Sequence, residues 1–327
     1  MTWRTALVVL VALLSGIAVV ARIALRLPEP PAHQVLVNGD VLTMDAGNRT
    51  VEALSLRGEL IEAVGSTDDI MALVDDATEV IDLRGRTVLP GFIDAHGHFP
   101  GSALPVIAAD LASPPLGGIN DMAGLLAALS ERAAITQPGD WVRGFGYDDT
   151  LLTEGRHPTR AELDAVSSEH PVVAMHVSGH LLAANSIALE RVGIGPDTPD
   201  PEGGVIGRRA GSSEPNGLLQ ETAAHELLGL SLAPGYLEAY RMMKVASLQY
   251  AAAGVTTAQA GGVSPRMLEG LNWFSRLGVV PQRLIVFAMD AEWGDALLDG
   301  SVNPEDQGSA KLVVAAVKLV ADGSIQG

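Results

Sequence analysis

The chain has 327 residues, of which 47% are hydrophobic and 18% are charged, and it contains no cysteine. This composition excludes an intrinsically disordered chain, a disulfide scaffold and any metal site with cysteine ligands. The 39 acidic residues outnumber the 21 basic residues and give a net charge of −18. Because nucleic acids and anionic membrane surfaces require basic patches, we expect neither as a partner of the folded part.

Residues 1–27 form a segment of their own, with three arginines and no acidic residue. An uncharged run from Thr5 to Ala21 lies between Arg4 and Arg22. This run is at the short limit for crossing a bilayer and is long for the core of a signal peptide. We therefore expect either a membrane anchor or an export signal, with the rest of the protein outside the cytoplasm and membrane contact through this segment alone. Residues 28–32 are rich in proline and predict a stiff linker.

Residues 33–88 carry short β-strand patterns separated by turn residues, which predict a small β-rich module. Asn38-Gly39 suits a type I′ turn and predicts a hairpin between Gln34–Val37 and Val41–Met44. A short helix is expected over Ser66–Val74. Further strands are expected at Ala53–Arg57, Leu60–Val64 and Val80–Asp82.

After Pro90-Gly91 the pattern changes to alternating strands and helices, which predicts a parallel sheet or barrel over residues 89–327. Apolar strands are expected at Phe92–His98, Trp141–Phe145, Pro171–Val177, Gly254–Gln259, Arg283–Met289 and Ala315–Val320. Helices are expected at Met122–Ala134, Arg160–Val166, Tyr236–Ala252 and Arg266–Leu277.

The first motif with chemical meaning ends the strand that follows Pro90-Gly91. Residues two apart share one face of a strand, so Asp94, His96 and His98 are expected to point the same way. Two neutral imidazoles at this spacing can bind one divalent cation. The alternative is a pair of packed or exposed histidines without a ligand.

With this motif in place, the sequence resembles the amidohydrolase superfamily, in the branch typified by N-substituted formamide deformylases. The resemblance runs from about residue 33 to the end of the chain. It rests on four phrases: Leu-Pro-Gly-Phe-Ile-Asp-Ala-His-Gly-His at 89–98; His-Pro-Thr-Arg-Ala-Glu-Leu-Asp at 157–164 with Ser-Gly-His at 178–180; Gly-Leu-Leu-Gln-Glu at 217–221 with Ala-Gly-Val-Thr-Thr at 253–257; and Val-Lys-Leu-Val-Ala-Asp-Gly-Ser-Ile at 317–325.

The resemblance implies a (β/α)₈ barrel of the TIM type with a small β-sandwich, of which residues 33–88 would supply part. It implies a hydrolase that cleaves a non-peptide C–N bond, such as that of an amide or formamide, in a small-molecule substrate. One or two divalent metal ions, most simply zinc, would activate water. His96 and His98 match the family's first ligand pair, and Lys318 stands where the branch carries a carboxylated lysine. The alternative for Lys318 is an ordinary strand-end lysine in a salt bridge.

Further candidates lie between these motifs. His176, Ser178 and His180 are expected on one face of a strand and its exit. His180 is the candidate for contact with substrate or an oxyanion, with a buried structural histidine as the alternative, and His176 is expected to be structural. Glu221 and His225 are four apart in an expected helix over Leu218–Leu228, an arrangement typical of a helix-surface pair. Asp322 would brace the Lys318 loop or be a plain turn residue.

Lys318 belongs to roughly the fourth barrel strand, and the sequence ends nine residues later. The remaining two histidines and the catalytic aspartate of the family would come from later strands. We therefore expect an N-terminal piece of a larger hydrolase, with the first half of the barrel in residues 89–327. The alternative is a catalytically inactive remnant or binding module with a partial metal site. The sequence does not predict the oligomeric state.

Overall fold

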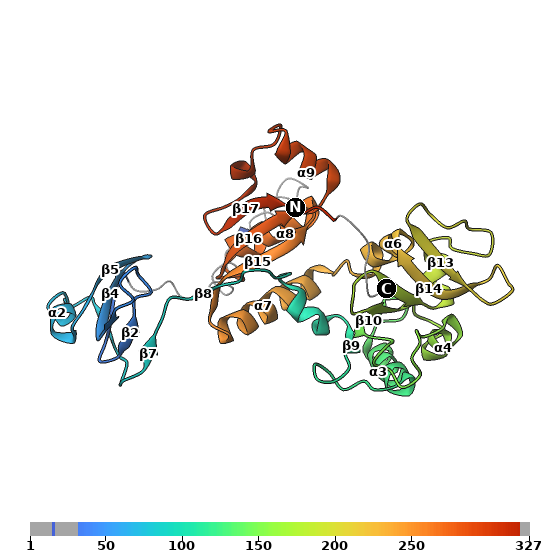
Figure 1. The fold of residues 1–327 in the computed structure, drawn as a ribbon, viewed down its shortest axis with the longest axis horizontal. Helices are drawn as coiled ribbons and strands as arrows, with labels where there is room; N and C mark the ends of the chain where they lie inside the picture. The colour runs from blue at the N-terminus through green and yellow to red at the C-terminus, as the bar shows by residue number, and fades with distance from the viewer. Residues whose placement is uncertain (1–14, 17–31, 321–327) are drawn as a thin grey trace, which may run out of the picture. The chain divides into compact units, whose positions relative to one another are not determined.

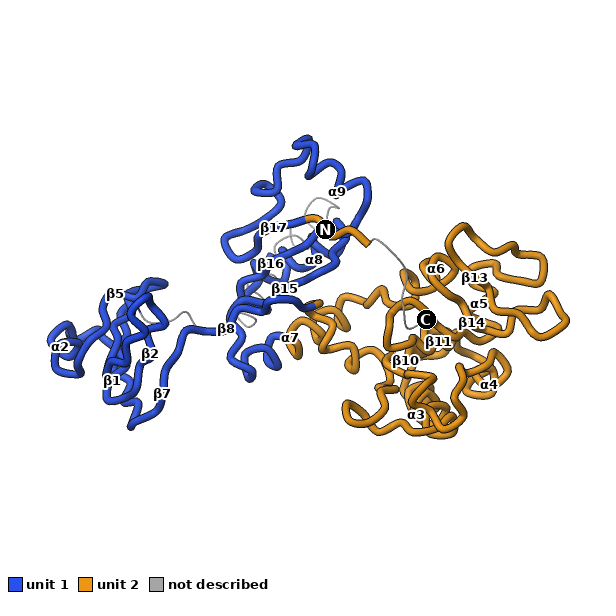
Figure 2. The backbone as a smooth tube through the Cα atoms, in the orientation of Figure 1, with its two compact units in different colours: residues 1–97, 247–316 blue, residues 98–246, 317–327 orange. Residues whose placement is uncertain are grey.

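The computed structural model describes residues 15–16 and 32–320, and its secondary structure is a mixture of helices and strands (Figure 1). The chain divides into two compact units (Figure 2). Unit 1 comprises residues 1–97 and 247–316, and unit 2 comprises residues 98–246 and 317–327. The predicted α/β class is confirmed. The strands of the described residues form four open sheets and no closed barrel.

The amino-terminal part of unit 1 contains two small sheets, with strand orders β5-β4-β1-β6 and β3-β2-β7. Most of the strands and the helix predicted here are confirmed, with Ser66 as the side-chain cap of the helix. The elements are β1 (His33–Val37), β2 (Asp40–Leu42), β3 (Thr50–Val51), β4 (Ala53–Arg57), β5 (Leu60–Gly65), α2 (Thr67–Met71), β6 (Glu79–Asp82) and β7 (Thr87–Val88).

The predicted hairpin between the first two strands is wrong. Asn38 has a left-handed φ of 58°, but β1 pairs with β4 and β6 whereas β2 pairs with β3 and β7. The cause is the packing of the apolar side chains. Val35 and Val37 belong to one buried cluster, and Val41 belongs to another. Asn38 therefore marks a crossover between two sheets, because separate cores outweigh the local turn preference.

The second part of unit 1 is a sheet of order β17-β16-β15-β8, which we call the β8 sheet. Its strand β15 pairs in parallel with both β8 and β16, as the predicted strand–helix alternation requires. The elements are β8 (Phe92–Ile93), β15 (Val255–Val263), α8 (Pro265–Arg276), β16 (Arg283–Ala288), α9 (Ala291–Leu298), η2 (Pro304–Gln307) and β17 (Leu312–Val317). Helix α7 (Tyr236–Ala252) has the bounds that the sequence predicts.

Strand β8 is shorter than predicted and ends at Ile93. The Asp94 N–H still donates to the carbonyl of Thr257, but the Gly97 N–H donates to the side chain of Gln259. The strand ladder is therefore replaced by a loop held by a side chain. The shared-face argument for Asp94, His96 and His98 is consequently wrong, since period-two alternation applies only within a strand.

Unit 2 contains a six-stranded sheet of order β13-β14-β12-β11-β10-β9. The strands β9, β10 and β11 run parallel, and the remaining pairs are antiparallel. The elements are η1 (Gly101–Val106), β9 (Ala109–Asp110), α3 (Met122–Ile135), β10 (Val142–Tyr147), α4 (Arg160–Val166), β11 (Val172–His176), β12 (Leu181–Ala184), α5 (Ser186–Arg191), β13 (Gly204–Arg208), β14 (Pro215–Glu221) and α6 (Thr222–Ser231).

Strand β11 lies at the centre of unit 2 and is buried on both faces. Val172 and Ala174 pack into a cluster with residues of α3 and α4, whereas Val173 packs into a cluster with residues of α5 and α6. This alternation places helices against both faces of the sheet. The strands predicted at Trp141–Phe145 and Pro171–Val177 therefore exist, but they lie in this sheet and not beside β8.

The predicted helix over Leu218–Leu228 is wrong in its first turn, because Pro215–Glu221 is strand β14 and α6 begins at Thr222. Strand β14 pairs with β12 and β13, and pairing with these two strands outweighs the helix preference of the leucines. Glu221 has a left-handed φ of 52° at the junction. Glu221 and His225 are therefore not an i,i+4 pair on one helix.

The prediction of a membrane-anchored or exported protein is contradicted. None of the described helices is long and apolar enough to cross a bilayer. The run from Thr5 to Ala21 that carried this prediction lies almost wholly outside the described residues. We therefore withdraw that prediction.

Candidate functional site

The motif of alternating histidines lies directly after β8. His96 is exposed and belongs to the end of unit 1, and His98 is exposed and opens unit 2. The carbonyl of His98 accepts a hydrogen bond from Gly101 at 2.6 Å, at the start of η1. Two exposed imidazoles on a short loop are chemically suited to bind a divalent cation.

The residue between the two histidines is fixed by β15. The Gly97 N–H donates to Gln259 Oε1 at 2.7 Å, and the Gly97 carbonyl accepts from the Gly261 N–H at 2.8 Å. Gln259 is only 2% exposed. A methyl group at Gly261 would meet both Gln259 Oε1 and the Gly97 carbonyl at 2.9 Å. Gly261 therefore permits the close approach that holds the loop in place.

Asp94 takes part in the same network. Its Oδ2 accepts from the Gln259 N–H at 3.4 Å. Burial and the neighbouring Asp94 carboxylate, which forms a hydrogen bond with the phenol, raise the pKa of Tyr250. A methyl group at Gly97 would clash with Asp94 Oδ2 and would lie 3.2 Å from the Tyr250 hydroxyl. Asp94 is therefore a brace of the loop that carries His96.

Lys318 follows directly after β17 and is half-buried. Its predicted role as a carboxylated ligand stays a prediction. Asp322, the predicted brace of this loop, lies outside the described residues.

His180 precedes β12 in a turn and pairs with a carboxylate. Its Nδ1 lies 2.8 Å from Oε2 of Glu221, and each side chain is about one-third exposed. Strand pairing brings the two side chains together, because Leu181, the residue after His180, is opposite Gln220, the residue before Glu221, in the β12–β14 register. The sequence did not predict this pair, because Glu221 was expected to lie in a helix and is 41 positions away from His180.

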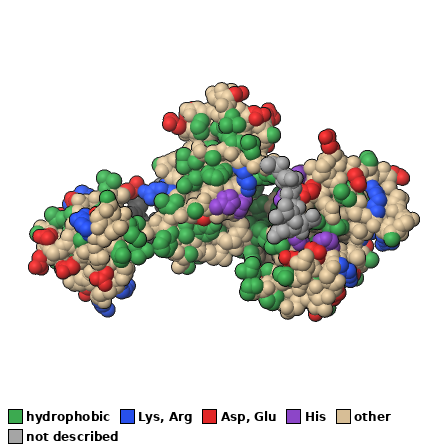
Figure 3. Space-filling view, in the orientation of Figure 1, with side chains coloured by type: hydrophobic (Ala, Val, Ile, Leu, Met, Phe, Trp, Pro, Cys, Tyr) green, Lys and Arg blue, Asp and Glu red, His purple; other side chains and the backbone are tan. Residues whose placement is uncertain are grey.

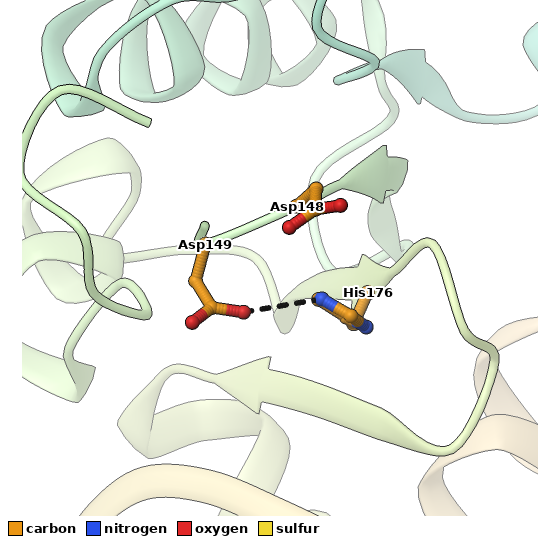
Figure 4. A group of neighbouring side chains, drawn as sticks. All are labelled: Asp148, Asp149 and His176. Atoms are coloured by element: carbon orange, nitrogen blue, oxygen red, sulfur yellow. Dashed lines mark ion pairs between the residues drawn. The ribbon is translucent and has the colours of Figure 1, made fainter. Parts of the chain in front are cut away.

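Several titratable residues gather at one edge of the unit 2 sheet. The parallel strands β9, β10 and β11 all end there, and ligands of open α/β sheets bind at such carboxyl ends. Asp148 and Asp149 follow β10, and His176 ends β11. One ligand atom from each of the three lies within 4.8 Å of the other two. Figure 4 shows the Asp149 carboxylate turned toward the His176 ring. We call these three residues the Asp–His group.

A bulge in β10 sets the direction of the two aspartates. The β10–β11 register shifts between Phe145 and Tyr147, so that Tyr147 lies opposite His176. Gly146, at the bulge, has a φ of 101°, which favours glycine. Bulges of this kind redirect the side chains that follow.

An aromatic cluster lies against the Asp–His group. The rings of Tyr147, His157 and His176 meet edge to face, with centroids 5.3–6.0 Å apart. Burial and the Asp149 carboxylate raise the pKa of Tyr147 well above its usual range. Burial lowers the pKa of His157 despite the opposing effect of Asp149. Both groups therefore favour their neutral forms.

The sequence motifs do not single out Asp148 and Asp149 as candidates, and His176 was expected to have a structural role alone. A signal for them exists in the chain. Two neighbouring apolar strands end in Tyr147-Asp148-Asp149 and in His176, and parallel strands bring such ends to one edge. Only the pairing of β10 with β11 shows that the two strand ends lie side by side.

Comparisons with known proteins agree with these features. The N-substituted formamide deformylase of Arthrobacter pascens is 38% identical over 193 residues, which are 59% of this chain and 35% of that protein. Protein LONG AFTER FAR-RED 3 of Arabidopsis thaliana is 30% identical over 250 residues, or 75% of this chain and 42% of that protein. The chain thus spans less than half the length of each of these two relatives.

A similar fold is found in the crystal structure of an uncharacterized metal-dependent hydrolase from Pyrococcus horikoshii. The TM-score is 0.67 and the sequence identity is 23%, with 89% of this chain and 55% of that chain covered. The sequence pattern of the amidohydrolase family matches residues 79–327, more than half of the chain. The resemblance inferred from the sequence motifs is thereby confirmed, and the chain belongs to the amidohydrolase family.

Proposed function

We propose that this chain is part of a metal-dependent hydrolase that cleaves a non-peptide C–N bond, such as that of an amide or an N-substituted formamide. The observation that carries the proposal is the exposed His96–His98 loop, fixed at the exit of β8 by Gln259. Membership of the amidohydrolase family and the likeness to a named formamide deformylase support the choice of bond.

In this proposal His96 and His98 bind one divalent ion, most simply zinc. Bound zinc lowers the pKa of a water ligand and polarises a carbonyl group. Lys318 supplies a further ligand after its neutral amine adds to carbon dioxide and loses a proton, which converts a repelling cation into an anionic carbamate. Asp94, Gly97 and Gln259 hold the histidine loop in place through the hydrogen bonds described above.

His180 is proposed to contact the substrate or a developing oxyanion. When its Nδ1–H donates to Glu221, the neutral ring presents Nε2 as an acceptor, and protonation converts Nε2 into a donor. The partial exposure of both side chains is compatible with contact to a small molecule. In this pair Glu221 is a positioning residue.

We further propose that β8, β15, β16 and β17 are successive strands of a (β/α)₈-type barrel, with residues 33–88 as part of a β-sandwich. The parallel pairing of β8, β15 and β16 supports this architecture. The exit of β8 would then lie at the end of the barrel where the active sites of this fold occur.

The experiment is a comparison of His96→Ala with His225→Ala, which changes an exposed histidine of α6. Zinc bound to the purified full chain is measured by mass spectrometry, and hydrolysis of a series of N-substituted formamides is measured for the protein that contains this chain. We expect His96→Ala to lose one equivalent of zinc and the turnover, because each ligand carries a large share of the binding energy. His225→Ala should behave as wild type. Unchanged zinc and turnover in His96→Ala would refute the proposal.

A further inference from the structure

The Asp–His group of unit 2 is separate in sequence from the His96–His98 loop and comes wholly from the ends of β10 and β11. We propose that Asp148, Asp149 and His176 form a binding site for a divalent first-row metal ion, distinct from the site of the proposed hydrolase function. Three protein ligands leave a further coordination position for water or an anionic ligand.

The state of the His176 ring supports a metal site. Its side chain is 2% exposed, and its Nε2 is a buried atom with no hydrogen-bond partner in the described part of the chain. Asp149 Oδ1 lies 3.2 Å from Nε2, close enough for an ion pair but not aligned to accept its proton. A buried polar nitrogen without a hydrogen bond is energetically unfavourable. A metal ion would satisfy Nε2 and Asp149 together.

The other nitrogen of His176 is already fixed. Nδ1 accepts a hydrogen bond from the Ser178 N–H at 3.2 Å and lies 2.8 Å from Ser178 Oγ. Metal binding at Nε2 would place the ring proton on Nδ1, which would then donate to Ser178 Oγ in place of accepting from the Ser178 N–H. A metal-bound histidine commonly donates from its second nitrogen in this way. Ser178 is therefore the positioning residue of the site.

The negative charge of the Asp–His group also favours a bound cation. Asp148 and Asp149 are adjacent carboxylates, and the ion-pair partners of Asp149 in the described residues are the histidines His157 and His176. A divalent cation would balance two carboxylate charges, whereas an unfilled site leaves like charges side by side.

The spacing of the ligand atoms fits a metal ion as well. Two ligands at about 2.0–2.2 Å from a tetrahedral zinc ion are about 3.3 Å apart. The separation of His176 Nε2 and Asp149 Oδ1 is 3.2 Å. Thr150 donates to Asp148 Oδ1 from its N–H at 2.9 Å and from its hydroxyl at 2.6 Å, and so fixes the second carboxylate. One imidazole and two carboxylates form a mixed nitrogen and oxygen set that suits zinc or manganese.

The test is zinc binding to the purified full chain after treatment with a chelator, by isothermal titration with metal content as a second readout. The variants are Asp149→Asn and His176→Gln, which keep the approximate size of each side chain. We expect each to lose one equivalent of zinc, or to bind it at least tenfold more weakly. The matched control is His170→Gln. His170 is another buried histidine, it precedes β11, and it is about 20 Å from His176 by strand geometry.

The double variant His96→Ala/His98→Ala separates this inference from the proposed function. We expect it to keep the equivalent of zinc that depends on Asp149 and His176. If the double variant loses all zinc while Asp149→Asn and His176→Gln bind as wild type, the inference is wrong and the proposed function stands. Zinc should also raise the thermal unfolding midpoint of wild type and of His170→Gln by more than that of the two ligand variants, which keep only the proposed His96–His98 site. Cooperative melting of those variants shows that they are folded, and an unchanged zinc-dependent rise in them would also refute the site.

Discussion

Gln259 accepts a hydrogen bond from the backbone of Gly97, a residue 162 positions earlier in the chain. The bond is 2.7 Å long and lies beside a glycine, Gly261, that leaves room for it. A buried amide in β15 therefore determines the path of the loop that presents His96. This side chain has no motif of its own in the sequence.

Replacing Gln259 by alanine should destabilise the chain and loosen the His96 loop. The part-buried Gly97 N–H loses its acceptor, which costs at most about 1–3 kcal/mol, the value for a fully buried donor. We expect a lower midpoint of urea unfolding and weaker zinc binding at the proposed hydrolase site. The matched control is Gln282→Ala, which removes another buried amide whose Nε2 donates to the Ser247 carbonyl at 2.7 Å. It should lower stability without changing zinc affinity, and an equal change in both variants would contradict the assigned role of Gln259.

Gly97→Ala should be strongly destabilising, because a methyl group at this position would clash with Asp94 Oδ2. The clash involves a braced carboxylate near the Tyr250 hydroxyl, so relief requires the brace to move. Overpacking of this kind typically costs about 1–3 kcal/mol. Gly118→Ala is the control, since nothing lies within 4 Å of the added methyl group. Thermal unfolding of the two variants side by side decides the prediction, which fails if they melt at the same temperature.

Gly146→Ala should disturb the Asp–His group through the bulge of β10. The φ of 101° is strained for alanine, and this strain costs about 1–3 kcal/mol. We expect lower stability together with weaker zinc binding by Asp149 and His176. Gly155→Ala is the comparison, because Gly155 also has a positive φ but lies outside the bulged strand. Loss of stability alone in Gly155→Ala, and of stability and zinc binding in Gly146→Ala, is the expected pattern.

Glu162 links pH to the stability of unit 2. Its carboxylate accepts from Arg156 and from the Thr159 N–H and hydroxyl, in the capping box of α4. The hydrogen bond from Arg156, followed by those from Thr159, lowers the pKa of Glu162 from 4.5 to about 2. A depressed carboxyl pKa stabilises the folded state at pH values above the pKa that the group has in the unfolded chain. This stabilisation is lost as the pH falls from about 4.5 toward 2.

The corresponding variant is Glu162→Gln, with a cost of about 1 kcal/mol at pH 7 from the weakened cap. Its difference in free energy of unfolding from wild type should shrink between pH 4.5 and 2, as measured by urea titration. Glu226→Gln, at an exposed position of α6, is the control and should show a small difference at both ends. A Glu162→Gln difference that stays constant across this pH range would contradict the prediction.

Local patterns predicted most elements of the chain. The bounds of α4 and α7 agree residue for residue, because apolar spacing and a Thr159–Glu162 capping box are local signals. The strand at β8 was overextended, since nothing in the local sequence shows that Gln259 ends the ladder at Ile93. Local sequence patterns also did not predict which strands share a sheet. Whether β10 lies beside β8 or in its own sheet depends on partners far away in sequence.

The same distinction between local and long-range signals applies to the candidate site residues. His96 and His98 were found from a compact motif, whereas the Asp–His group joins residues almost thirty positions apart through strand register. The pair of His180 with Glu221 was missed because a strand was taken for a helix. Site residues that lie in one short segment can be predicted from the sequence. Site residues that strand pairing brings together can be found only once the sheet topology is known.

The parallel pairing of β8 with β15 has a consequence for the order of folding. These adjacent strands are separated by the whole of residues 98–246, which form the bulk of unit 2. Closing so long a flexible loop is entropically unfavourable, and contacts of high sequence separation form slowly. Prior folding of residues 98–246 would shorten the effective loop and speed the meeting of β8 with β15. The His96 loop then acquires its final path late, after the inserted residues have become structured.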